Sequence, residues 1–253
     1  MAEHEESSSA TRQHHEQMLK LVAKGFYNEL INYGVNEADV LAVAGHLLDN
    51  VMQKSSSTNK ETEYYNRLFA IKDVKDEWAA AKRLTLQEVS IAPLSPSLVP
   101  QIVNWLREPA TRESFYPRFP DSKEDLANYF QAPTREYFSI FQQQKLAGII
   151  GAENIHLESA RLEMRKLVGD PELHGKGIGK RATFLFLYHS FVIRKSRKVF
   201  LHSLDINIRN INLNGKFGFE LEGVFLEEAM IQGKWRDVVR MALAGPVWLE
   251  LFS

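Results

Sequence analysis

The stretch HGKGIGKRA, residues 174–182, places three glycines at alternate positions among lysines and leads directly into an apolar, helix-like segment. Glycine lets the backbone approach a ligand closely and adopt dihedral angles that other residues avoid. The start of a helix offers unpaired N–H groups and a partial positive charge, which together suit a phosphate. The stretch therefore predicts a phosphate-binding loop, with a turn that serves only tight packing as the alternative.

Two common phosphate loops do not match this stretch. A Walker A loop has a glycine, four residues and then Gly-Lys-Ser/Thr, but Lys180 stands where the second glycine would fall after Gly175. The dinucleotide fingerprint G-x-G-x-x-G would also need a glycine at that position. Both classes of nucleotide-binding site are therefore excluded.

The overall composition excludes further classes. The 253 residues include 31 basic and 32 acidic side chains, a formal net charge of −1, which argues against a nucleic-acid binder because such proteins rely on surplus Lys and Arg. The chain has no cysteine, so it forms no disulfide, thiolate nucleophile or Cys-ligated zinc site. No metal site is expected, since the adjacent His14 and His15 would point apart on a helix.

The beginning of the chain carries no apolar signal. MAEHEESSSATRQHH is acidic and polar, and no stretch approaches the roughly 20 apolar residues that a bilayer crossing requires. We therefore expect a cytoplasmic protein that does not contact a membrane.

The first third of the chain predicts an all-α region. Residues 1–10 are expected to be disordered, and a helix from Thr11 is expected to end near Gly34. Asn36 caps a second helix, residues 54–61 form a polar loop, and a third helix is expected over 62–82. The predicted domains are thus 1–83, helical, and 84–253. The helical region is expected to shape an acceptor site, to form a homodimer or to bind a partner, and these alternatives remain open.

From Leu84 the pattern changes to strands that alternate with helices, which predicts an α/β fold with a mixed central sheet flanked by helices. A hairpin is expected to turn at Gln232–Gly233. Strands are expected over 84–94, 135–142, 145–156, 161–169 and 198–206. Surface helices are expected over the stretches SPSLVPQIVNWLREP and DSKEDLANYFQAP. A further helix is expected after the glycine loop, and a short helix over NIRNINLNGKFG.

The loop fits the Arg/Gln-x-x-Gly-x-Gly/Ala signature of the GNAT acetyltransferases, with His174, Gly177 and Gly179 in its defined positions. LEMRKLVGDPELHGKGIGKRA resembles their fourth strand, pyrophosphate loop and following helix. KFGFELEG and GKWRDVVRM resemble the subgroup of ribosomal-protein, spermidine and amino-sugar N-acetyltransferases. The resemblance covers about residues 85–245 and implies the GNAT fold, with acetyl-CoA as co-substrate.

The resemblance also implies where acetyl-CoA binds. The loop amides would hold the pyrophosphate, and the edge of the fourth strand would pair with the pantetheine arm. His174 departs from the usual Arg or Gln, and a loop-filling role is its alternative. Asn207 and Asn212 would bind cofactor amides or phosphates, with helix capping by Asn207 as the alternative. The expected cofactor-binding residues are Leu167, Val168, Gly169, His174, Gly175, Lys176, Gly177, Ile178, Gly179, Lys180, Asn207 and Asn212.

Three residues are expected to take part in the chemistry. Glu163 is the candidate base or water-holding carboxylate, with a solvated strand glutamate as the alternative. The resemblance implies that the N–H of Val168 is the oxyanion donor. Asn214 occupies the place where many GNAT members carry a proton-donating tyrosine, and an asparagine cannot supply a proton. The thiol would then leave as a thiolate.

The expected function is acetyl-CoA-dependent N-acetylation of a primary amine on a small metabolite or a protein N-terminus. Acidic residues such as Glu153, Glu227 and Glu228 would attract a cationic acceptor. One alternative is a GNAT-fold acyl-CoA-binding regulator or scaffold with weak or no transferase activity. Another is transfer of a different acyl group.

Overall fold

The computed structural model describes residues 16, 18–31, 35–36, 39–41, 43–44, 64–112 and 114–253. The chain divides into two compact units, residues 1–63 and 64–253. In the first unit, residues 18–31 are helical, and Asn36 Oδ1 accepts the N–H of Asp39 at 3.0 Å, as expected for a helix cap. The predicted disordered lead and the loop over 54–61 lie outside the described residues.

The predicted helix over residues 62–82 is wrong. The described part of this segment forms two short 3-10 turns, a strand and one helical turn instead, so it belongs largely to the sheet-bearing unit. Phe69 is buried, and its ring lies 5.3 Å from that of Phe184. The helix-like spacing of the aromatic residues in this segment therefore reflects tertiary packing. The elements are η1 (Tyr65–Arg67), η2 (Ile71–Asp73), β1 (Lys75–Glu77) and α3 (Trp78–Ala81).

The strand predicted over residues 84–94 is two strands joined by a tight turn. Gln87 adopts a positive φ of 55°, which reverses the chain between them. Apolar residues alternate on both sides of the turn, at Leu84 and Leu86 and again at Val89 and Ile91, and the only sign of the break is the spacing of three between Leu86 and Val89. The two strands are β2 (Arg83–Leu86) and β3 (Val89–Pro93), paired antiparallel.

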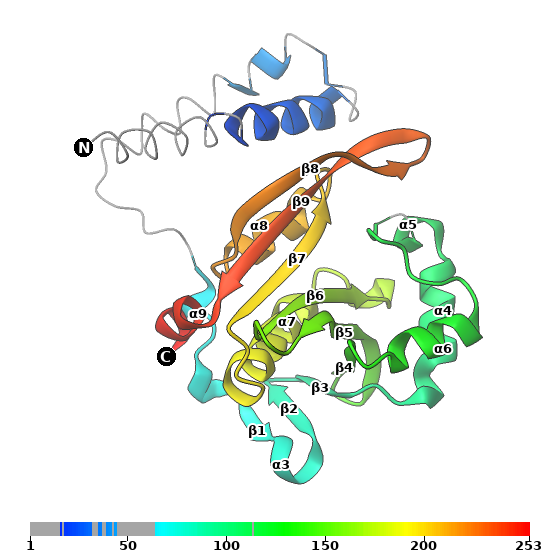
Figure 1. Cartoon of the computed structure of the whole chain (residues 1–253), viewed down its shortest axis with the longest axis vertical. Helices are drawn as coiled ribbons and strands as arrows, with labels where there is room; N and C mark the ends of the chain where they lie inside the picture. The colour runs from blue at the N-terminus through cyan, green and yellow to red at the C-terminus, as the bar shows by residue number, and fades with distance from the viewer. Residues whose placement is uncertain are drawn as a thin grey trace. The chain divides into compact units, whose positions relative to one another are not determined.

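A mixed sheet forms the centre of the second unit, as predicted (Figure 1). Within the described residues it has nine strands in the order β1-β2-β3-β4-β5-β6-β7-β9-β8. The hairpin predicted to turn at Gln232–Gly233 is confirmed, with φ of 50° and 74° at those two residues. The remaining strands are β4 (Glu136–Gln142), β5 (Lys145–His156), β6 (Arg161–Val168), β7 (Lys198–Leu204), β8 (Glu220–Ile231) and β9 (Lys234–Ala244).

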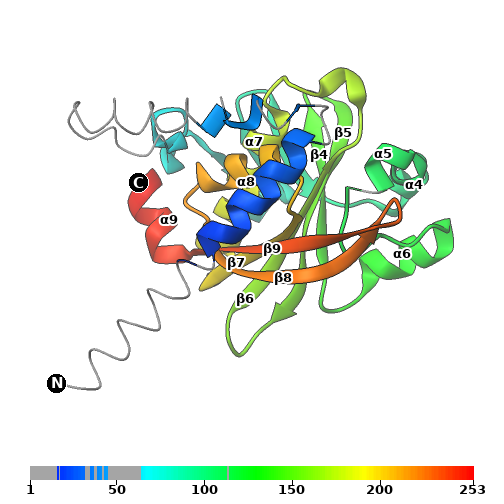
Figure 2. The ribbon, with the colours of Figure 1, turned by 90° about the horizontal axis from the view of Figure 1, so that it is seen from above.

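Helices cover both faces of this sheet (Figure 2). Successive strand residues point to opposite faces, so Phe138 and Ile150 pack in the core with α7, whereas Tyr137 and Ile149 pack with α4 and α6. None of the helices that the structure describes has the length and apolar character for crossing a membrane. The helices are α4 (Val99–Arg107), α5 (Pro109–Arg112), α6 (Lys123–Gln131), α7 (Ile178–Tyr188), α8 (Ile208–Gly215) and α9 (Gly245–Phe252), with η3 (Pro96–Leu98), η4 (Pro171–Leu173) and the π-helical turn η5 (His189–Ile193).

The neighbouring strands β6 and β7 separate part-way along their length. They are parallel and pair only from Arg161 opposite Lys198 to Glu163 opposite Phe200. Both strands continue beyond this point, to Val168 and Leu204, without pairing to each other. The separation exposes two strand edges inside the sheet, where a ligand can reach backbone groups.

Candidate active site

A groove of about 790 Å³ runs between the start of α7 and α8 and reaches the free edge of β6. The glycine loop and Tyr65 line it, and its cationic side chains are Lys166, Lys180, Arg209 and Lys216. The helix α7 begins at Ile178 after Gly177, which makes no side-chain cap. The amides of its first turn are therefore left for a ligand, as is usual for a helix start.

Backbone geometry at Gly177 supports an anion site. Its φ of 75° is one that residues with side chains rarely adopt. A Cβ at this position would lie 2.8 Å from Arg181 Nη1 and from Lys180 Cε. The loop therefore fits the pyrophosphate of acetyl-CoA: its amides, with Lys180, would hold the negative charge.

The strand β6 presents only some of the predicted residues to the groove. Gly169 donates its N–H to Ala147 on β5 at 2.9 Å. Because backbone groups alternate along a strand, Leu167 also faces β5, whereas Lys166 and Val168 turn their backbone groups toward the gap. Val168 therefore lines the groove, and Leu167 and Gly169 do not.

His174 lies in the groove wall but bonds back to the strand. Its Nε2 lies 2.9 Å from the carbonyl oxygen of Val168, which can only accept, so Nε2 is the donor. The imidazole thus fixes the loop against the end of β6. Of the predicted loop residues, Gly175, Ile178 and Gly179 also line the groove, whereas Lys176 does not.

Asparagines of α8 form the opposite wall. Asn207 Oδ1 accepts the N–H of Asn210, so the capping alternative holds while the residue also lines the groove, as Asn212 does. Asn214 is fully buried, and neither its Oδ1 nor its Nδ2 has a hydrogen-bond partner among the residues that the structure describes. Asn207, Asn210 and Asn214 follow helical spacing and all line a second cavity of about 100 Å³. An unpaired buried amide there points to a ligand that completes it.

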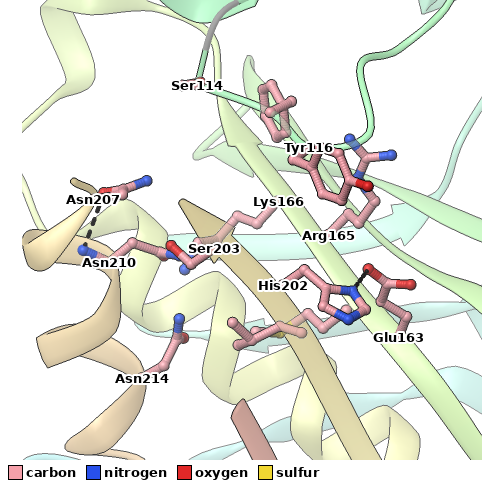
Figure 3. Close-up of a pocket in the computed structure, with 13 residues that line it drawn as sticks. Ser114, Tyr116, Glu163, Arg165, Lys166, His202, Ser203, Asn207, Asn210 and Asn214 are labelled. Atoms are coloured by element: carbon pink, nitrogen blue, oxygen red, sulfur yellow. Dashed lines mark hydrogen bonds and ion pairs between the residues drawn. The ribbon is translucent and has the colours of Figure 1, made fainter. Parts of the chain in front are cut away.

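The second cavity lies where β6 and β7 part (Figure 3). Glu163 on β6 is 3% exposed and accepts two hydrogen bonds, from His202 Nδ1 on β7 at 2.8 Å and from Asn154 Nδ2 at 2.7 Å. Burial alone would raise the pKa of Glu163. The hydrogen bonds from His202 and Asn154 and the charge of Arg165 outweigh it, so the pKa lies below its ordinary value of 4.5.

This pair determines which ring nitrogen of His202 donates to Glu163. An ionised carboxylate only accepts hydrogen bonds, so Nδ1 of the imidazole carries the proton. Nε2 is the ring nitrogen left over by this bond, and no described residue donates a hydrogen bond to it. The arrangement can accept a proton at Nε2 while Glu163 holds the ring in place and stabilises the charged form.

A loop held by Arg165 closes the far side of the cavity. The Arg165 guanidinium is 5% exposed, lies 3.4 Å from Glu153 and donates to the carbonyl of Pro117. Tyr129 and Tyr137 also donate to Glu153, which is therefore buried and not available to an acceptor amine. In the same loop, the Tyr116 hydroxyl donates to Glu228 on β8 at 2.7 Å, and this bond raises the pKa of Tyr116 to about 12.

Of the thirteen residues that line this cavity, only Glu163, Asn207 and Asn214 were expected from the sequence. The unexpected residues include Tyr116, Lys166, His202 and Asn210. The signal for Asn210 was available, because it continues the helical spacing of Asn207 and Asn214. Lys166 stands between Met164 and Val168 on one face of a predicted strand, where an apolar residue is usual. No local pattern reveals that β7 brings His202 to Glu163.

Comparisons with known proteins agree with this geometry. The model of the acetyltransferase (GNAT) family matches residues 99–219. The spermidine N(1)-acetyltransferase of Vibrio cholerae is 30% identical over 148 residues, which cover 58% of this chain and 81% of that protein. The chain belongs to the GNAT acetyltransferase family. It is therefore an N-acetyltransferase with acetyl-CoA as co-substrate, as predicted.

Other relatives carry the same name. The spermidine N(1)-acetyltransferase of Escherichia coli K12 is 25% identical over 139 residues, 55% of this chain and 71% of that protein. Among solved structures, the spermidine N-acetyltransferase of Vibrio cholerae in complex with CoA and spermine has a TM-score of 0.61 at 23% identity, covering 64% of this chain and 99% of that chain. This likeness confirms the GNAT fold.

Proposed function

We propose that this enzyme acetylates a primary amine of a polyamine such as spermidine, at the point where β6 and β7 part. The observation that carries the proposal is the Glu163–His202 pair, because it places a proton acceptor in the cavity next to the acetyl-CoA groove. Two relatives named as spermidine N(1)-acetyltransferases support the polyamine as the acceptor.

The role of the pair follows from the chemistry. A polyamine carries protonated amines near neutral pH, and only a neutral amine attacks a thioester carbonyl. His202 Nε2 takes the proton from the attacking amine, and Glu163 stabilises the imidazolium that results. We thus assign the base role expected of Glu163 to His202, with Glu163 as the residue that orients it, because both carboxylate oxygens already accept hydrogen bonds.

The negative charge that develops on the carbonyl oxygen also needs a donor. The Val168 N–H lies on the free edge of β6 and has no strand partner on the β7 side. We propose this amide as the oxyanion donor. Asn214 is proposed to bind the thioester end of the cofactor through its unpaired amide.

Charge near the cavity suits a cationic acceptor. The buried Arg165 is neutralised by Glu153, so it repels a cation less than its position suggests. Glu228, at the mouth next to Tyr116, is exposed and offers an anion for a second ammonium group of a polyamine. A monoamine would lack that contact and bind more weakly.

Self-association is part of the proposal. One solved relative from Vibrio cholerae is described as dodecameric, with a TM-score of 0.57. We propose that this chain also forms a homo-oligomer, which light scattering of the full-length protein will measure.

An acceptor panel tests the polyamine proposal. Release of the CoA thiol is measured with spermidine, spermine, an aromatic monoamine and a peptide with a free N-terminus. We expect the highest kcat/KM with the polyamines and a mass increase of one acetyl group on them. A preference for the peptide or the monoamine would contradict the polyamine assignment while leaving the transferase activity intact.

A further inference from the structure

Acetyl transfer from a thioester releases a thiolate, and the site must supply a proton for it. This requirement rests on the proposed function, because the thiolate forms only if the acetyl group leaves CoA. The resulting question is which group in the site carries a proton that it can give away near neutral pH.

Most titratable groups around the cavity cannot give a proton. Glu163 is ionised, and Arg165 keeps its proton: burial alone would lower the pKa of Arg165, but the acidic groups around it, Glu153 among them, outweigh burial and raise that pKa. The Tyr116 hydroxyl donates to Glu228, and its pKa of about 12 is far above that of a thiol. His202 uses its Nδ1 proton on Glu163, is assigned the proton of the amine at Nε2, and lines the acceptor cavity but not the acetyl-CoA groove. Asn214 has no transferable proton.

Lys166 is the remaining titratable group, and it lies at the junction of the two spaces. It lines both the acetyl-CoA groove and the acceptor cavity, together with Asn207 and Asn210. Figure 3 shows its side chain in the cavity that also holds His202 and Asn214. The thioester must lie at this junction, because the cofactor enters through the groove and the amine through the cavity.

The ammonium group of Lys166 is held in place but not neutralised. Its Nζ donates to Thr183 Oγ1 at 2.7 Å, and the threonine hydroxyl in turn donates to the Gly179 carbonyl at 2.8 Å. No carboxylate of a described residue lies within 4 Å of Nζ. An enclosed cation without a counter-ion is unfavourable by itself, and a thiolate beside it would supply the missing charge.

We infer that Lys166 is the proton donor to the departing CoA sulfur. The amine nitrogen forms a bond to the acetyl carbon, and the C–S bond breaks with its electron pair on sulfur. One N–H proton of the Lys166 ammonium moves to that sulfur, which leaves a neutral amine at Nζ. The proton taken up by His202 and the one lost by Lys166 balance, and both groups return to their starting states through water.

The acidity of Lys166 matches this task. Burial lowers the pKa of Lys166 to about 8, close to the ordinary value of about 8.5 for a thiol. Proton transfer between two groups of similar pKa is nearly balanced in free energy, so it proceeds readily in either direction. Three further cations line the same groove, Lys180 on α7, Arg209 at the start of α8 and Lys216 directly after it, and their charge favours the thiolate as well.

The first test measures whether Lys166 lies at the sulfur, and it needs no acceptor. The full-length protein is saturated with CoA, and the bound thiol is titrated by the ultraviolet absorbance of its thiolate. An ammonium group next to the sulfur should lower the thiol pKa by at least about one pH unit. Lys166→Met should abolish the shift, and Lys166→Arg should keep it. Lys123→Met, at an exposed position on α6, is the control and should match the wild type.

The second test measures proton donation. For Lys166→Arg we expect kcat about 10²-fold below wild type, because a guanidinium holds its proton too tightly to act as an acid, with the KM for acetyl-CoA changed less than about threefold. The wild-type kcat should fall as pH rises through about 8, where Lys166 loses its proton. That alkaline fall should be absent in Lys166→Arg.

The outcomes are separable. An ordinary thiol pKa in the wild-type complex, or a Lys166→Met protein that only loses affinity for CoA, would overturn the inference and make Lys166 a phosphate ligand. Wild-type kcat in Lys166→Arg would overturn the donor role. Absence of turnover with every amine would contradict the proposed function, and the thiol titration would still decide the position of Lys166. If Lys166→Met does not fold, Lys166→Gln replaces it.

Discussion

His202 Nδ1 lies 2.8 Å from Glu163 Oε1, across two strands that have just stopped pairing. Glu163 is the last β6 residue paired with β7, opposite Phe200, and His202 comes two residues later on the same face of its strand. The hydrogen bond thus spans the separation of the strands at its narrow end. One geometric feature of the sheet therefore creates both the ligand groove and the position of the proposed base.

Removing either member of this pair should slow the chemistry. For Glu163→Gln and for His202→Gln we expect kcat to fall about 10²-fold with little change in the KM for acetyl-CoA. The double variant should be hardly slower than either single one, because the two residues act as a unit. Steady-state kinetics checks this, with Glu158→Gln at an exposed turn as the control. Additive losses would show that the two residues act independently.

Gly177→Val should abolish binding of acetyl-CoA. The substitution places a branched side chain at φ 75°, where the first atom alone would lie 2.8 Å from Arg181 and Lys180 side chains. Isothermal calorimetry with CoA measures the loss. Gly215→Ala is the matched control, since a Cβ there meets nothing within 4 Å. A folded Gly177→Val protein with wild-type affinity would contradict the anion site.

Stability should fall in mild acid because of His189. Burial among Trp78 and Phe138, at ring distances of 4.4 and 4.8 Å, lowers the pKa of His189 to about 4. In the unfolded chain the imidazole of His189 has its ordinary pKa of about 6.5. Neutral His189 therefore contributes fully to the free energy of unfolding above pH 6.5, and this contribution is lost as the pH falls from 6.5 to 4. The expected loss is about 3 kcal/mol.

Urea unfolding at pH 7 and at pH 4.5 measures this effect. In His189→Phe the difference between the free energies of unfolding at pH 7 and at pH 4.5 should be smaller, because the phenyl ring fills the same apolar site without binding a proton. An equal pH dependence in both proteins would assign the acid sensitivity to other groups.

The domain boundary can be tested by truncation. A chain that begins at Leu84 lacks Tyr65 and Phe69, which pack in the core of the sheet-bearing unit, and also lacks β1. We expect it to be insoluble or much less stable, since loss of a buried phenylalanine alone costs about 3–5 kcal/mol. A chain that begins at Tyr64 should keep its melting temperature and bind CoA. Equal stability of the two truncated proteins would contradict this packing.

Much of the fold was predictable because its signals are local. The glycine loop before an apolar helix, the alternation of β4 to β6 and the turn at Gln232–Gly233 each depend on neighbouring residues. The segment 65–82 was misjudged because Tyr65 and Phe69 are spaced as in a helix but are placed by contacts with Phe184 and Phe217.

The site was predictable where it is built from backbone, and less so where it depends on side chains from separate strands. Val168 and the glycine loop follow from the motif. The hydrogen-bond partner of Glu163 is His202, which lies 39 residues later in the sequence, on another strand. The position of Lys166 is informative only in the structure, where this residue lines both the groove and the cavity.

The most direct measurement for the central claim is a structure of the enzyme bound to CoA and spermidine. Our account predicts the CoA sulfur between β6 and β7, near Lys166, with a primary amine of spermidine beside His202 Nε2. Spermidine bound elsewhere with its amines away from His202, or a CoA sulfur outside the separation of β6 and β7, would contradict it.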